Sequence, residues 1–303
     1  MPQHTTATRP FGTVLTAMVT PMRADGSVDL KAAADLATHL VAHGNDGIVL
    51  NGTTGEAPTT HAPEKSDLIR AVVEAVGDDA VVLAGAGSND TAHAVRMAEQ
   101  AAEAGAHGLL VVSPYYSRPS QAGVIAHVSA IADSTELPVM LYDVPVRTGV
   151  RFAGDTLATL AEHERVVAIK DATGDLEAAV VNQSRTGLAW YSGDDALVLA
   201  FLAHGGVGVV SMVAHIAGDR VADAVRSFHA GDVSAARDHL VELLPAIDII
   251  SGSGNGALRS KLTLWLLGIL PSAAMRLPHV EADADEVDRV RAALRAAGLE
   301  PVR

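Results

Sequence analysis

The feature that most constrains the fold is an alternation of short apolar segments with longer amphipathic ones. Nearly continuous apolar runs are typical of strands buried on both faces of a parallel sheet. Between most of them lie Ala-rich stretches with helical periodicity, such as residues 30–44 and 91–108. The apolar runs are "VLTAMVTP" (14–21), "GIVLNG" (47–52), "VVLAGAG" (81–87), "GLLVVSP" (108–114), "PVMLYDVP" (138–145), "VVAIKDA" (166–172), "LAWYSGDD" (188–195) and "GVGVVSM" (206–212).

This alternation predicts an α/β fold, a (β/α)8 TIM barrel. Eight strand–helix units within about 220 residues suit that barrel, whose usual length is roughly 250 residues. A doubly wound open sheet is the alternative, but the sequence lacks the Gly-rich nucleotide turn that often accompanies it. Beyond Gly218 the pattern is helical only. We therefore expect the barrel and its active site in residues 1–218 and a C-terminal helical region in residues 219–303.

Composition narrows the partners and the compartment. A net charge of -14 disfavours a nucleic-acid or anionic membrane surface, because both attract basic patches. The absence of cysteine excludes disulfides, thiolate metal sites and cysteine nucleophiles, and it suits a reducing cytoplasm. The first ten residues are polar and no apolar run approaches 18 residues, so neither a secretion signal nor a membrane span is expected. We expect a cytoplasmic protein.

Reactive side chains gather at the predicted strand ends, where such barrels carry their chemistry. Lys170 follows the apolar run 166–169, so burial would favour its neutral amine, which can attack a carbonyl. The alternative is a structural ion pair with Asp171 or another acidic strand end, and position alone leaves both open. Tyr142 with Thr53 could relay protons, and Arg147 could grip a carboxylate.

Five motifs, in order, carry a family resemblance. The chain resembles the dihydrodipicolinate synthase and N-acetylneuraminate lyase family of class I aldolases, over nearly its full length. The Thr pair and the arginine Arg147 favour the synthase branch. The motifs are "GTTGE" (52–56), "PYYSRP" (114–119), "YDVPVRTG" (142–149), "IKDATG" (169–174) and "SGDD" (192–195).

The resemblance implies a lyase that condenses pyruvate with L-aspartate 4-semialdehyde in lysine and diaminopimelate biosynthesis. Lys170 would form an imine with pyruvate, and Tyr142, Thr53 and Tyr116 would relay protons. The resemblance implies that a neighbouring subunit donates Tyr116 within a homotetramer of two tight dimers. An iminium is itself an electron sink, so no metal or organic cofactor is expected.

The resemblance also implies which residues bind the two small-molecule substrates. Hydroxyl and backbone groups of Thr53 and Thr54 would hold the pyruvate carboxylate, and Arg147 would hold the carboxylate of the aldehyde. Further positions that shape the site are Gly193, Asp194 and the backbone of Val210.

Two alternatives remain, together with an expectation about regulation. Another pyruvate- or 2-keto-acid-dependent aldolase would share the chemistry, whereas a non-enzymatic binding barrel would have no need of the intact residue set. In lysine-regulated members of the family a His and a Glu bind lysine at a subunit interface, and here Lys65 and His93 align with them. A cationic Lys65 would repel that ligand, so we expect weak or absent lysine inhibition.

Overall fold

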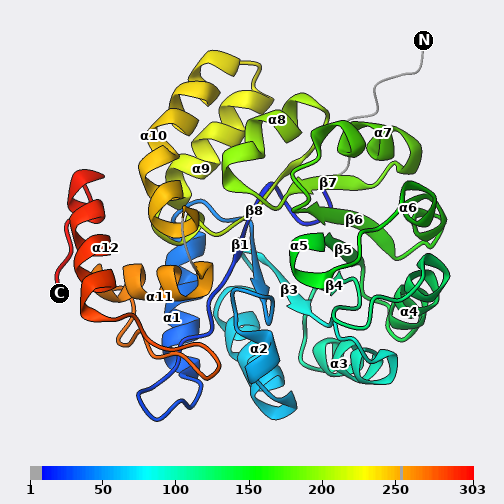
Figure 1. Cartoon of the computed structure of the whole chain (residues 1–303), viewed down its shortest axis with the longest axis horizontal. Coiled ribbons are helices and arrows are strands. Elements are labelled where there is room, and N and C mark those ends of the chain that lie inside the picture. Colours follow the sequence, from blue (N-terminus) through cyan, green and yellow to red (C-terminus); the bar gives the residue numbers. More distant parts are fainter. Residues whose placement is uncertain (1–8, 253–254) are drawn as a thin grey trace.

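The computed structural model describes residues 9–252 and 255–303 and confirms the predicted barrel. Most of the polar N-terminal segment, residues 1–8, lies outside the described residues. Figure 1 shows the strands at the centre of the molecule with helices around them. All pairings are parallel, and β1 closes on β8. The strands are β1 (Val14–Ala17), β2 (Gly47–Leu50), β3 (Val81–Gly85), β4 (Gly108–Val112), β5 (Val139–Asp143), β6 (Val166–Asp171), β7 (Ala189–Ser192) and β8 (Gly208–Ser211).

Helices follow the strands and begin where polar residues cap them. Asp29, Asp90, Ser120 and Asp175 each accept a hydrogen bond from a backbone N–H in the first turn, which satisfies donors that lack a partner within the helix. The helices around the barrel are α1 (Leu30–Ala42), α2 (Ala62–Val76), α3 (Thr91–Glu103), α4 (Gln121–Asp133), α5 (Pro145–Thr148), α6 (Gly154–Ala161), α7 (Leu176–Thr186), α8 (Val198–Ala203) and α9 (Ala214–His229).

Side chains of alternate strand residues fill the barrel interior. Leu15, Val49, Met140, Ala168 and Val210 belong to one buried cluster, and residues between them in sequence pack outward against the helices. This two-sided burial is why the strands read as continuous apolar runs. Alternation places Lys170 on the same face of β6 as Ala168, so its side chain points into the barrel.

The C-terminal helical region packs on one side of the barrel (Figure 1). Its helices α10 (Val233–Ser251), α11 (Gly256–Leu266) and α12 (Ala284–Ala296) share an apolar cluster with α9. The expected boundary at residue 218 falls inside α9, beside its kink at Ala217, where φ is -142°. Within the described residues, no helix has both the length and the apolar character needed to cross a membrane.

Candidate active site

Lys170 and Tyr142 lie side by side at the carboxyl ends of two neighbouring strands. They are in register between β5 and β6, and the Lys170 Nζ is 4.4 Å from the centre of the Tyr142 ring. Both residues are buried, Lys170 to 5% exposure. The Lys170 nitrogen is thus held against an aromatic face, away from bulk water. The ring does not use up the hydrogen-bonding capacity of the nitrogen, so it can contact another partner.

Asp171 does not neutralise this lysine. Its carboxylate accepts hydrogen bonds from Trp190 Nε1 at 3.0 Å and from the backbone N–H and hydroxyl of Thr173. In the described part of the chain, the lysines that form ion pairs are Lys31 and Lys261. The structural tether that the sequence left open for Lys170 is therefore not formed.

A cavity of about 460 Å³ opens beside Tyr142, while Lys170 is not among the residues that line it. Tyr142, Thr53, Tyr116 and Arg147 all line it, although they come from β5, the β2–α2 loop, the β4–α4 loop and α5. Arg147 and Thr53 are exposed, and Tyr116 is 89% exposed with a left-handed φ of 70°. The cavity therefore combines hydroxyl groups and a guanidinium that could receive a substrate bearing carboxylates.

The remaining predicted positions surround the site without lining this cavity. Thr54 is buried in the loop next to Thr53, and Val210 faces the barrel interior on β8. Gly193 follows β7, where a Cβ would come within 2.9 Å of the carbonyl oxygen of Asp171. Asp194 accepts a hydrogen bond from the backbone N–H of Ala196, so its carboxylate caps its own turn.

Lys65 and His93 also line this cavity. They are the two positions that the sequence analysis aligned with the lysine-binding residues of lysine-regulated family members. Lys65 Nζ donates to the Ala57 carbonyl and to Thr60 Oγ1, each at 2.7 Å. Burial lowers the pKa of Lys65 to about 8. The ammonium of this lysine thus rests on uncharged acceptors inside the cavity.

The sequence reasoning missed a buried carboxyl next to Tyr142. Asp143 lies opposite Asp171 in the β5–β6 register, and its Oδ1 has no hydrogen-bond partner among the described residues. Burial, with a further contribution from Asp171, raises the pKa of Asp143 to about 7. Asp143 belongs to the motif "YDVPVRTG", which the sequence analysis did single out. The motif does not indicate that the Asp143 carboxyl is buried.

A second missed set joins the end of β7 to the end of β8. Asp195 is buried and accepts hydrogen bonds from Ser211 Oγ and from the backbone N–H groups of Met212 and Val213. Burial raises the pKa of Asp195. These bonds fix the end of β7 to the end of β8 at the mouth of the barrel.

Comparison with known proteins agrees with this geometry. The model of the Dihydrodipicolinate synthetase family matches residues 10–297. A 4-hydroxy-tetrahydrodipicolinate synthase from Bifidobacterium longum is 53% identical, with 98% of each chain covered.

Solved structures give the same family. The synthase of Cyanidioschyzon merolae, determined with lysine bound, has a TM-score of 0.92 at 38% identity, with 96% of this chain and 100% of that chain covered. The chloride-inhibited synthase of Acinetobacter baumannii, complexed with pyruvate, has a TM-score of 0.90 at 33% identity, with 95% and 99% covered.

These relatives confirm the predicted activity class. It is that of 4-hydroxy-tetrahydrodipicolinate synthase, a lyase of the class I aldolase type that acts on small molecules in lysine and diaminopimelate biosynthesis. The match extends over nearly the whole chain and includes all five sequence motifs. The chain belongs to the dihydrodipicolinate synthetase family.

Proposed function

We propose that Lys170 is the nucleophile of a Schiff-base condensation of pyruvate with L-aspartate 4-semialdehyde. The observation that carries this proposal is the position of its Nζ against the ring of Tyr142, which lines the cavity, with Asp171 engaged elsewhere. The amine adds to the keto carbon, and the resulting carbinolamine loses water to give the imine. The iminium then accepts the electron pair that is left when a methyl proton departs, and the enamine attacks the aldehyde carbon.

Tyr142, Thr53 and Tyr116 relay the protons of these steps. Each carries a hydroxyl that can both donate and accept, and Tyr142 and Thr53 line the same cavity, while Tyr116 of a neighbouring subunit would complete the relay. The exposure of Tyr116 supports its insertion into a neighbouring subunit, as in the expected homotetramer of two dimers. The reaction then needs no metal or organic cofactor.

The substrate carboxylates are assigned to two places. Thr53 and Thr54 hold that of pyruvate, and Arg147 at the rim holds that of the aldehyde. Gly193, Asp194 and the backbone of Val210 shape the site from outside the cavity lining. All of these residues fall in residues 1–218, the part assigned to catalysis, while residues 219–303 support it. Function in the cytoplasm fits the absence of cysteine and the biosynthetic family.

Borohydride reduction tests the imine directly. With pyruvate present, reduction should fix a mass adduct on the peptide that contains Lys170. Lys65 is the internal control, because it is partly buried, it lines the cavity, and burial lowers its pKa. An unmodified chain, or an adduct on Lys65, would refute the proposal.

Arg147→Ala tests the aldehyde partner. We expect the KM for aspartate semialdehyde to rise about 10- to 100-fold, the worth of a charge-assisted hydrogen bond, with the KM for pyruvate nearly unchanged. If the KM for aspartate semialdehyde does not change, the aldehyde is another one.

Lysine regulation is proposed to be weak or absent. The Lys65 ammonium, together with His93, lines the cavity where an incoming ammonium would need anionic partners. Inhibition by L-lysine at sub-millimolar concentration would contradict this.

A further inference from the structure

A network of polar contacts links the Thr53–Thr54 loop to the C-terminal helical region. The loop, residues 51–61, follows β2 and contains two non-glycine residues in the left-handed region, Asn51 (φ 54°) and Glu56 (φ 56°). Such backbone conformations are costly and persist only where the surroundings enforce them. The loop that lines the cavity therefore needs support from outside itself.

Glu56 provides one end of that support. Its side chain is fully buried and forms an ion pair with Lys261 of α11, whose side chain is also fully buried. The Lys261 Nζ further donates to the Ala274 carbonyl at 2.8 Å, and the Arg276 backbone N–H donates to Glu56 Oε2 at 3.1 Å. One carboxylate thus joins the loop to two separate segments of the C-terminal region.

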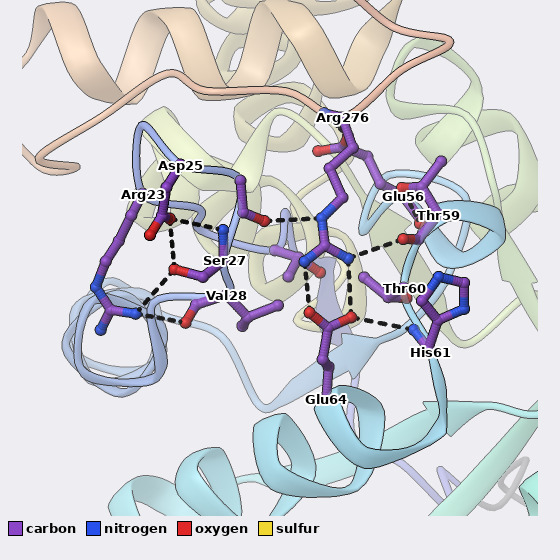
Figure 2. A network of polar contacts seen from close by, with 12 residues as sticks. Arg23, Asp25, Ser27, Val28, Glu56, Thr59, Thr60, His61, Glu64 and Arg276 are labelled. Carbon is purple, nitrogen blue, oxygen red and sulfur yellow. Dashed lines mark hydrogen bonds and ion pairs between the residues drawn. The ribbon is translucent and has the colours of Figure 1, made fainter.

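Arg276 provides the other end (Figure 2). Its guanidinium forms a two-nitrogen contact with Glu64 at the start of α2, and it also donates to the carbonyls of Thr59 and Gly26, each at 2.8 Å. Glu64 in turn accepts from the backbone N–H of His61. Both ends of the segment from Glu56 to His61 are therefore fastened to the same arginine.

The link reaches the threonines through the backbone. The N–H of Glu56 donates to the Thr53 carbonyl at 3.1 Å, and that of Ala57 donates to the Gly52 carbonyl at 3.2 Å. Thr20 Oγ1 holds the Gly55 carbonyl at 2.7 Å from the β1 side. A change in the position of Glu56 must therefore shift Thr53 and Thr54.

We propose that Glu56, paired with Lys261, is a positioning residue that sets the geometry of Thr53 and Thr54 toward the pyruvate carboxylate. Buried ion pairs contribute little net stability compared with apolar residues of similar size, and fixing one conformation is a recognised use of them. The C-terminal region would then support the active site although it does not line the cavity. This inference rests on the proposed function, in which those threonines bind pyruvate.

The test separates positioning from stability with the double variant Glu56→Met/Lys261→Met. Replacing both partners leaves no buried charge unpaired, so we expect a melting temperature close to that of the wild type. We expect kcat/KM for pyruvate to fall about 10- to 100-fold, mainly through KM, because a misplaced carboxylate site weakens binding. The initial rate of borohydride trapping at low pyruvate should fall by the same factor.

A matched control is Glu286→Gln. It weakens a less deeply buried ion pair of the C-terminal region, which joins Arg259 of α11 to Glu286 of α12 and not to Glu56. We expect some loss of stability and unchanged kinetics. Glu56→Gln is a second loop variant, for use if the double variant does not fold, and it is assayed well below its melting temperature. The substitution keeps the shape of the side chain. It should raise KM for pyruvate more than Glu286→Gln does.

The outcomes are distinguishable. A folded double variant with wild-type kcat/KM for pyruvate overturns the positioning role, and so does wild-type KM in Glu56→Gln if the double variant does not fold. Failure of the proposed function would appear instead in the wild type, as no trapped adduct on Lys170.

Discussion

Two lysines of this chain are almost completely buried, yet their surroundings differ in kind. Lys170 ends β6 with its nitrogen on the Tyr142 ring, and Lys261 lies in α11 with its nitrogen between a carboxylate and a carbonyl. Burial lowers the pKa of Lys261, while Glu56 acts against that shift. Burial alone therefore does not identify a nucleophile.

The difference lies in what occupies the nitrogen. Lys261 is engaged by Glu56 and Ala274, so its electron pair is unavailable and its position is fixed. Lys170 lies against the π face of Tyr142, and Tyr142 lines the cavity, so we expect a carbonyl carbon that enters the cavity to reach the amine. A buried lysine without a carboxylate partner is the one to test for covalent chemistry, and the predictions that follow separate the two kinds.

The largest effect is expected from Lys170→Met. Turnover of pyruvate with aspartate semialdehyde should fall by at least ~1,000-fold, because the amine proposed to form the imine is removed. Stability should be unchanged or higher, since an apolar chain replaces a buried amine. A coupled assay and a thermal melt measure both. If Lys170→Met kept turnover within ten-fold of the wild type, Lys170 would not be the nucleophile, and it would not differ from Lys261 in this respect.

Lys261→Met should have the opposite profile. It leaves Glu56 buried without its cation, so the free energy of unfolding should fall by about 3–5 kcal/mol. Urea unfolding measures this, and Lys31→Met is the control, because the Lys31–Asp35 pair is exposed and solvent screens it, so its loss should hardly change stability. A loss as small as that of the control would mean that Glu56 does not need Lys261.

Tyr142→Phe separates the contribution of the Tyr142 ring from that of its hydroxyl. The variant keeps the aromatic face beside Nζ and removes the proton relay, so kcat should fall about 100-fold with little change in melting temperature. Tyr191→Phe is the matched control. Its hydroxyl donates to the Gly12 carbonyl at 2.9 Å and Tyr191 is not among the cavity-lining residues, so the variant should cost stability and leave kcat unchanged. Equal kcat values for the two variants would argue against a relay through Tyr142.

The barrel and the reactive strand ends could be predicted from the sequence because each depends on local pattern. Alternation along β6 and its order among the strands bring Lys170 beside Tyr142 without knowledge of any loop. The partner of Glu56 could not be predicted, since Lys261 is 205 residues away and helical periodicity marks it only as a position in an apolar helix. The burial of Asp143 was missed for the same reason, because it depends on helices packed outside the barrel.

Buried carboxyls can be compared in the same way as the buried lysines. The smallest predicted effect, a change in stability with pH, concerns one of them. Asp143 lacks the close cation that Glu56 has, and its pKa is about 7 against an ordinary 3.8. Asp171 raises that pKa, whereas Arg151 and a backbone hydrogen bond from Phe152 lower it. Between about pH 4 and 7 the folded state therefore holds a proton that the unfolded state has lost, so stability should fall as pH rises through that window.

Asp143→Asn tests this directly, because the amide mimics the protonated carboxyl at every pH. At pH 8 the variant should be more stable than the wild type by on the order of 1–2 kcal/mol, and the gap should narrow as the pH falls toward 4, because the folded wild type then holds its proton. Urea unfolding at a series of pH values measures the difference. A constant gap from pH 4 to 8 would show that Asp143 stays ionised, in which case the cation that balances it must be Arg151 and the carboxyl belongs with the paired groups.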